Sequence, residues 1–387
     1  LKRAHVTTDT PEPRLGRIER RPDGSPLGTL REWHACDLML DVAPPTDPEA
    51  LVTAVVKSCE VANSNGITWM QDAWVDLNGH RPFITALERN QLTVRTNLAF
   101  RADPDHWRQQ ADDFIRMRAE VHAAGNEHLL TARTVKFFVD GVVESATAEM
   151  IAPYLDTHEH GMPNWSREEL LLAVAHFDAL GFQTHLHAIG DRAVRHALDS
   201  IENATEVNET WDRRSTITHV QVVHPDDLPR FAELGVIANF QAHWAQEDDL
   251  MTKLTAPRLG PERTNLQYPV GSLWRSGARL SFGSDWPVSP NNFVETMLVA
   301  ATRQTDDGSP AEGWVPEQRI TVDDGLLIAT AGTAYQSYTE KFRGTLAVGM
   351  AADLVVLDRD VTSVEPMVAR KAVASETYLS GVKVFSR

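Results

Sequence analysis

The chain has 387 residues, more than one compact domain usually needs, so we expect one large barrel and an appended unit. With 42% hydrophobic and 24% charged residues, its composition is ordinary for a soluble globular enzyme. Its net charge of −17 argues against the basic surface that nucleic acids or anionic membranes require, so we expect neither as a partner. No apolar run reaches the roughly 18 residues that would span a membrane, and the two cysteines, Cys36 and Cys59, favour a cytoplasmic location.

The first 48 residues predict a loop or small excursion. They are rich in proline, glycine, arginine and aspartate, with a hairpin turn expected at Pro22-Asp23-Gly24. The chain opens at Leu1 without a methionine and in mid-pattern, so we expect it to be an excerpt of something longer.

From Asp47 onward, helical stripes alternate with short apolar strands. Seven strands are predicted, at Ile67–Met70, Leu92–Leu98, Thr134–Val139, Phe182–Leu186, Thr216–Val220, Val236–Phe240 and Leu280–Phe282. Strands separated by helices imply parallel crossovers, in a closed barrel or an open doubly wound sheet. A closed (β/α)8 barrel needs eight strands, so the missing one would precede residue 1.

The last residues change character. Short β-branched strands punctuated by glycine, with no helices between them, follow residue 343. We therefore predict a barrel unit over residues 1–343, with 1–48 as the loop or insertion, and part of a β-sandwich over 344–387.

An aspartate follows the last predicted barrel strand in the stretch LSFGSDWPVSP. Gly283 is expected to let the backbone turn, which presents Asp285 at the carboxyl end of the strand. In a parallel barrel that end is where chemistry is usually found. The alternative is an ordinary turn or helix-capping aspartate.

Three of the fifteen histidines stand out by position: His187 directly follows the predicted strand Phe182–Leu186, His219 lies at the end of the next strand, and His243 follows the strand Val236–Phe240. Lys136 lies inside the strand TVKFFV, where a period of two places it on the same face as Phe138. Burial lowers the pKa of a lysine, and a neutral amine can capture carbon dioxide as a carbamate that bridges two metal ions. The alternative is a lysine that extends from the strand end into solvent.

If the barrel forms, Lys136, His187, His219 and Asp285 all point to one mouth. Imidazoles and a carboxylate are good ligands for zinc, manganese or iron. The prediction of a metal site depends on the barrel, because no local motif such as HExxH is present.

The stretches KFFVDGVVES, HLHAIGDRA, ITHVQVVHPDD, FGSDWPVSP and GTLAVGMAADLVVLD resemble the amidohydrolase superfamily, in particular the branch that includes N-substituted formamide deformylases. The resemblance implies a distorted (β/α)8 barrel with a sandwich built from both chain ends, so that one sandwich edge here is expected to be unpaired. It implies metal-ligand roles for Lys136, His187 and His219, and the roles of ligand and proton shuttle for Asp285. The family's first-strand His-x-His is absent, and we expect it upstream of Leu1.

These features predict a metal-dependent hydrolase of amide-type C–N bonds, acting on a small N-acyl or N-formyl amine. One or two divalent ions, zinc above all, and a carbamate on Lys136 are expected. Trp69, Phe138, His243 and Trp286 are predicted to shape an apolar substrate pocket. The alternatives are a barrel that binds a ligand or partner without catalysis, and a hydrolase of ester or cyclic amide bonds. Assembly into a homo-oligomer is left open.

Overall fold

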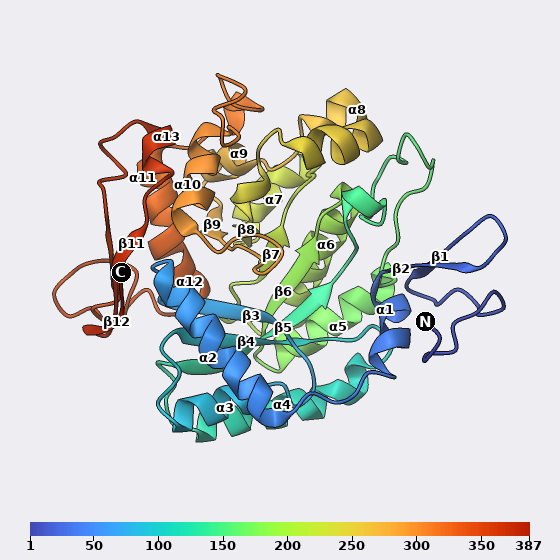
Figure 1. Cartoon of the computed structure of the whole chain (residues 1–387), viewed down its shortest axis with the longest axis horizontal. Helices are drawn as coiled ribbons and strands as arrows, with labels where there is room; N and C mark the ends of the chain where they lie inside the picture. The colour runs from blue at the N-terminus through green and yellow to red at the C-terminus, as the bar shows by residue number, and fades with distance from the viewer.

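Seven parallel strands form one curled sheet in the order of the chain (Figure 1). The computed structural model describes all residues from 1 to 387. The strands are β3 (Trp69–Val75), β4 (Arg95–Arg101), β5 (Leu130–Phe138), β6 (Gln183–Ala188), β7 (Thr216–His219), β8 (Ile237–Phe240) and β9 (Arg279–Phe282). Each of the seven predicted strands is therefore present. The eight-strand count of a closed barrel is not reached, since β3 and β9 each pair on one side only.

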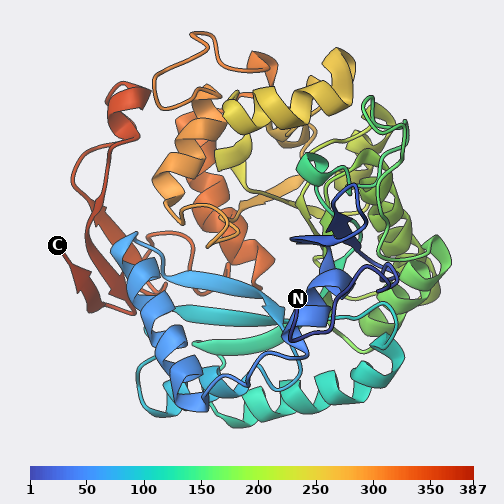
Figure 2. The same ribbon diagram turned by 45° about the vertical axis from the view of Figure 1, so that its right-hand side comes forward.

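Helices cover the outer face of the sheet (Figure 2). They are α2 (Pro48–Ser64), α3 (Arg81–Glu88), α4 (Trp107–Ala123), α5 (Arg167–Ala179), α6 (Asp191–Val207), α7 (Leu228–Glu233), α9 (Val270–Arg275), α10 (Phe293–Thr302) and α11 (Val322–Leu327). Helix α8 (Ala256–Thr264) packs instead on the loop of residues 152–155, and α12 (Thr333–Gln336) lies at the amino end of the sheet. An apolar core of 57 buried residues fills the layer between the helices and the sheet. No helix combines the length and the hydrophobicity that crossing a membrane would require.

The inside of the curled sheet is polar, although barrel interiors are usually filled by branched apolar side chains. Buried amides and hydroxyls project inward from successive strands, including Asn97, Thr134, Gln183, Asn239 and Ser281. These side chains form hydrogen bonds with one another between neighbouring strands. This polar interior runs from the amino ends of the strands, the floor of the barrel, to their carboxyl ends, the mouth.

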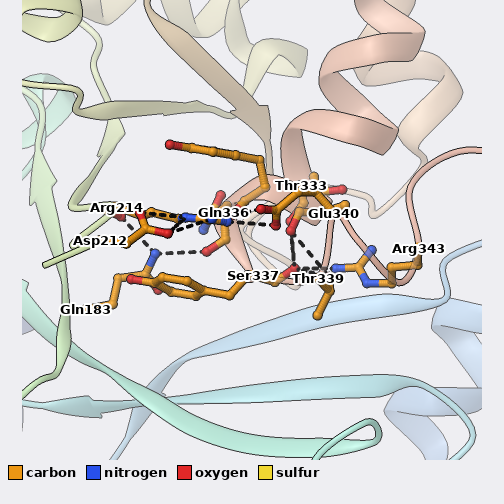
Figure 3. A network of polar contacts seen from close by, with 12 residues as sticks. Gln183, Asp212, Arg214, Thr333, Gln336, Ser337, Thr339, Glu340 and Arg343 are labelled. Carbon is orange, nitrogen blue, oxygen red and sulfur yellow. Dashed lines mark hydrogen bonds and ion pairs between the residues drawn. The ribbon is translucent and has the colours of Figure 1, made fainter.

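Helix α12 and the segment that follows it close the amino end of the sheet (Figure 3). The Gln183 side-chain amide donates to the backbone carbonyls of Arg214, at 2.8 Å, and Gln336, at 2.9 Å. Arg214 in turn donates through two nitrogens to the Glu340 carboxylate, both at 2.8 Å. The network anchors the floor of the barrel to the chain beyond it.

The last residues form a separate antiparallel sheet, as expected, although the sequence predicted no helix between its strands. Its strands are β10 (Leu354–Leu357), β11 (Ala374–Leu379) and β12 (Val382–Ser386), with α13 (Pro366–Ala369) in the β10–β11 connection. β11 is the central strand, so β10 and β12 each have an unpaired edge. The sheet packs beside α2 (Figure 1) and is bound to the barrel by a buried ion pair between Arg95 and Asp353.

The N-terminal segment is more structured than a loop. β1 (Arg17–Arg20) and β2 (Pro26–Arg31) form the expected hairpin around Asp23 and Gly24, and Gly24 has the positive φ of 83° that favours glycine. Helix α1 (Trp33–Leu40), which the sequence did not predict, follows the hairpin. Hairpin and helix lie at the carboxyl ends of β3, β4 and β5 (Figure 2).

Candidate active site

The four predicted site residues come together at the carboxyl ends of the strands. Lys136 and His187 lie on the neighbouring strands β5 and β6, and His219 ends β7. The rings of His187 and His219 have centroids 4.4 Å apart. Asp285 follows β9, and Lys136 is close enough to lower its pKa. Side chains from three strands and from the loop after a fourth strand therefore share one mouth.

Both histidines are held neutral. Burial lowers the pKa of His187 to about 3, with a further contribution from the charge on Lys136. Burial also lowers the pKa of His219 well below its usual value, and His187 and Lys136 add to the effect. Imidazoles that stay neutral at physiological pH can offer a lone pair to a metal ion.

Hydrogen bonds show which ring nitrogen of each histidine carries the hydrogen. Nε2 of His187 donates to the backbone carbonyl of Gly141 at 3.1 Å. Nδ1 of His219 lies 2.6 Å from the side-chain oxygen of Gln241, which can only accept. The remaining nitrogens, Nδ1 of His187 and Nε2 of His219, have no hydrogen-bond partner in the protein. Each histidine therefore keeps one nitrogen free.

Lys136 is enclosed and not extended into solvent. The residue is 3% exposed, and its ammonium nitrogen lies 5.0 Å from the centroid of the Phe138 ring. No carboxylate forms an ion pair with it. Burial lowers its pKa to about 7, while Asp285 acts in the opposite direction. A substantial fraction of the amine is thus neutral near pH 7, as carbamate formation requires.

The Asp285 carboxylate is not used for turn or helix capping. Its side chain accepts no hydrogen bond, and the residue that caps α10 is Asn292, whose oxygen accepts from two backbone amides. Asp285 stays in contact with solvent. Desolvation by its surroundings raises its pKa, and Lys136 opposes this rise. The carboxylate is therefore accessible to solvent and takes no part in hydrogen bonds that hold the fold together.

The backbone is strained at two of the strand ends. His219, Val220 and Asp285 have φ angles of 78°, 48° and 55°, in the left-handed region. This conformation is unfavourable for a side chain with a Cβ and most of all for β-branched valine. Such strain costs on the order of 1–3 kcal/mol per residue and is concentrated at functional sites in proteins. The strain falls on two of the predicted site residues.

The donor set is suited to a divalent metal in its chemistry, although it is sparse. No group of three or more His, Cys, Asp or Glu side chains gathers closely enough to hold an ion. The two free imidazole nitrogens and the enclosed, easily deprotonated amine of Lys136 are nevertheless the types of ligand that zinc accepts, once the amine is converted to a carbamate. Lys136, His187, His219 and Asp285 are the residues that would hold the ion.

The predicted pocket residues divide between the two ends of the sheet. Phe138 lies at the mouth, with its ring centroid 5.4 Å from that of His187. His243 lies in the turn after β8 and pairs with Glu295 at 3.4 Å. Trp286 is 46% exposed beside Asp285. Trp69 begins β3 at the opposite end of the sheet, where the Arg343 guanidinium lies 5.1 Å from its ring, so it is not brought to the site.

Two tryptophans that were not predicted lie at the mouth, where Trp69 was expected. Trp74, near the carboxyl end of β3, and Trp33, at the start of α1, lie with ring centroids 4.0 Å apart. Both contact Phe138, at 4.9 and 5.3 Å. A third tryptophan, Trp244, stacks on His219 at 5.6 Å. The mouth is therefore walled by aromatic rings, one of which comes from the N-terminal segment.

Asp72 of β3 is an enclosed carboxyl group that no prediction included. Burial raises its pKa to about 6, although the Trp74 backbone N–H donates to it at 3.1 Å. Since the pKa is higher in the folded than in the unfolded protein, ionisation of Asp72 destabilises the fold as the pH rises between about 4 and 6.

We expect Asp72→Asn to raise the free energy of unfolding by about 2 kcal/mol above pH 6 and to have no such effect below pH 4. Asparagine keeps an oxygen that can accept from Trp74 and carries no charge. Urea unfolding at both ends of this pH range measures the difference. A gain of equal size at both ends would contradict the assignment of the effect to charge.

Comparisons with known proteins agree with this architecture. The model of the amidohydrolase family matches residues 1–385. The chain is 29% identical to the protein LONG AFTER FAR-RED 3 of Arabidopsis thaliana over 92% of its own length and 61% of that protein's. It is 26% identical to the N-substituted formamide deformylase of Arthrobacter pascens, with 99% of this chain and 69% of the deformylase covered. The chain thus spans about six-tenths to seven-tenths of the length of these relatives.

Solved structures show the same fold. A metal-dependent hydrolase from Pyrococcus horikoshii superposes with a TM-score of 0.73 at 23% identity, covering 92% of this chain and 68% of the hydrolase. The atrazine chlorohydrolase TrzN of Arthrobacter aurescens, solved with zinc, gives a TM-score of 0.55 at 15% identity over 88% of this chain and 72% of its own. With the family match over nearly the whole sequence, the chain belongs to the amidohydrolase family.

Proposed function

We propose that this protein is a metal-dependent hydrolase of amide-type C–N bonds in small N-acyl or N-formyl amines. The observation that carries the proposal is the convergence of two neutral imidazoles, an enclosed lysine and a free carboxylate at one mouth. The N-substituted formamide deformylase among the relatives supports the type of bond, and the zinc-containing chlorohydrolase supports the choice of metal.

His187 and His219 would hold a divalent ion through their free nitrogens, together with the carbamate of Lys136 and with Asp285. Such an ion lowers the pKa of water and polarises a carbonyl group. Asp285 would accept a proton from the attacking water and deliver it to the leaving nitrogen, so that the amide and water yield a carboxylic acid and an amine. The absence of any structural hydrogen bond to Asp285 leaves its oxygens available for both transfers.

The aromatic rings would bind the apolar part of the substrate. Phe138, Trp33 and Trp74 contact one another beside His187, and a planar or aliphatic group could pack against them. His243 and Trp286 flank the mouth on the far side, after β8 and β9.

Lys136→Met tests the metal site. Methionine fills a similar volume but cannot form a carbamate, so we expect zinc affinity to be at least about 10-fold weaker. Loss of a residue that only hydrogen-bonds to a metal ligand already weakens metal affinity by about this factor. Metal content after dialysis against zinc measures it, with the exposed Lys57→Met as a matched control. Short carboxylic acids with bicarbonate should partly restore zinc binding to the smaller Lys136→Ala. Equal zinc content in Lys136→Met and wild-type protein would contradict a ligand role.

A barrel that binds small molecules without hydrolysing them is the alternative that the sparse donor set favours. The two proposals differ in metal content, because the non-catalytic barrel would contain much less than one ion per chain. A screen of N-formyl and N-acyl amines with the zinc-loaded protein then tests the reaction itself.

A further inference from the structure

Gln241 lies directly behind one of the two site histidines. It follows β8, is 3% exposed, and places its side-chain oxygen 2.6 Å from Nδ1 of His219. The ring of His219 is stacked on Trp244 on one face, so its plane is also restricted. An oxygen facing Nδ1 selects the tautomer in which Nδ1 carries the hydrogen.

The orientation of the Gln241 amide is set by its neighbours. Its nitrogen donates to the side-chain oxygen of Asn239 at 3.0 Å and to the Thr218 hydroxyl at 3.3 Å. The Thr218 hydroxyl donates its own hydrogen to Asn239 at 2.9 Å and is therefore left as an acceptor toward Gln241. With the nitrogen occupied in this way, the oxygen of Gln241 must face His219.

The same order of donor and acceptor continues from Asn239 toward the amino end of the barrel. The Asn239 nitrogen donates to the Ser281 hydroxyl at 2.8 Å, and Ser281 donates to the side-chain oxygen of Gln336 at 2.5 Å. Gln336 lies in the network at the amino end, next to Gln183 (Figure 3). A chain of donors and acceptors thus runs from the floor of the barrel to His219.

His185 provides an internal contrast, since it faces the same interior from β6. The backbone N–H of Arg133 donates to Asn97 at 3.2 Å, which fixes the Asn97 amide so that it donates to the oxygen of Gln71 at 2.9 Å. Gln71 consequently presents its nitrogen to Nδ1 of His185. The hydrogen of His185 is then on Nε2, which is buried without a partner. Two glutamines of opposite orientation leave the two histidines in opposite tautomers.

Gly283 makes room for this arrangement. A Cβ built at Gly283 would lie 3.0 Å from the Gln241 nitrogen and 3.1 Å from the Asn239 oxygen, closer than side chains normally pack. Its φ is not in the left-handed region, so glycine is needed here for space. This differs from the sequence expectation that Gly283 permits a sharp turn.

We propose that Gln241 is a positioning residue that holds His219 in its Nδ1–H tautomer and so keeps Nε2 free for a metal ion. The inference rests on the proposed function, because it assigns Gln241 to the same metal site. It adds a residue outside the ligand set, oriented by a polar barrel interior.

Zinc affinity measured by competition with a chromophoric chelator tests the role. Gln241→Met keeps the length of the side chain and removes the acceptor, so we expect binding about 10–100-fold weaker. Gln241→Glu keeps an acceptor oxygen toward Nδ1 but loses the donation to Asn239 and Thr218, so it should weaken zinc binding less than Gln241→Met does. Gln267→Met is the matched control, since Gln267 is 0% exposed and its side-chain oxygen accepts from Gln221 at 2.9 Å and not from a site histidine. It should lose stability without losing zinc affinity.

Nitrogen-15 NMR of the metal-free protein supplies a readout that does not depend on zinc. The signals that disappear in His219→Gln identify the ring, and we expect wild-type His219 to carry its hydrogen on Nδ1 and Gln241→Met to lose this preference. An Nε2–H tautomer in the wild type, or an unchanged tautomer in Gln241→Met, would overturn the inference. If wild-type protein binds no zinc, the proposed function fails, and the tautomer still decides whether Gln241 orients His219.

Discussion

Asp285→Asn is expected to lower kcat by about 10²–10⁴-fold, the usual contribution of a general acid–base group. Asparagine has the same size and keeps one coordinating oxygen but cannot take a proton. Because the Asp285 side chain makes no hydrogen bond within the protein, the fold and much of the metal content should be unchanged. Steady-state kinetics on a substrate found by the amide screen measures the loss.

The control for this experiment is Asp226→Asn, which neutralises a carboxylate that is 82% exposed. It should leave kcat and the urea midpoint unchanged. If Asp285→Asn keeps near-normal kcat on a good substrate, Asp285 is a turn residue and the proposed proton transfer is wrong.

Arg95→Met is expected to lower the free energy of unfolding by about 3–5 kcal/mol, because it leaves the charge of Asp353 buried without an opposite charge. Both side chains are 4% exposed, and the guanidinium donates to Asp353 at 2.6 and 2.9 Å. It also donates to the His128 carbonyl and the Ser380 hydroxyl, both at 2.6 Å. This single side chain joins β4 to the C-terminal sheet.

Urea unfolding measures the effect. The double variant Arg95→Met/Asp353→Leu removes both charges and should be more stable than Arg95→Met alone. Arg89→Met, which breaks the exposed pair with Glu49, should barely shift the urea midpoint. Equal effects of Arg95→Met and Arg89→Met would show that burial adds nothing to the ion pair.

The strand order and the four residues at the strand ends were accessible from the sequence. The strands are short and apolar, and parallel strands bring their carboxyl ends to one edge, so Lys136, His187, His219 and Asp285 could be expected at the same mouth. The resemblance to the family supplied the roles of these residues. Neither argument required side-chain contacts.

The pocket residues were harder to predict from the sequence, because the polar interior hides where the strands begin and end. The apolar pattern ends at Met70, yet β3 continues through Gln71 and Asp72 to Val75. This extension moves the mouth from Trp69 to Trp74. Inward-facing amides interrupt the periodicity from which strands are recognised, so the error at Trp69 has the same origin as the hydrogen-bonded interior.

The glutamines behind the histidines and the tryptophan of α1 could not have been found from spacing. Gln241 follows β8 and contacts His219 on the neighbouring strand β7, and Trp33 contacts Phe138 over a sequence separation of more than a hundred residues. Glutamine and tryptophan occur widely in loops and cores, and neither has a spacing rule that ties it to a metal ligand. Only the packing distinguishes them.

The polar barrel interior also bears on how freely this sequence can diverge. In an apolar core, residues of similar volume exchange at a cost usually below about 1.5 kcal/mol, so such positions drift among Leu, Ile and Met. At Thr134, Asn239 or Ser281 the same exchange removes a donor and leaves an acceptor unpaired, which costs on the order of 1–3 kcal/mol. Neutral drift inside the barrel is therefore narrow, and sequence variation should concentrate in the helices outside.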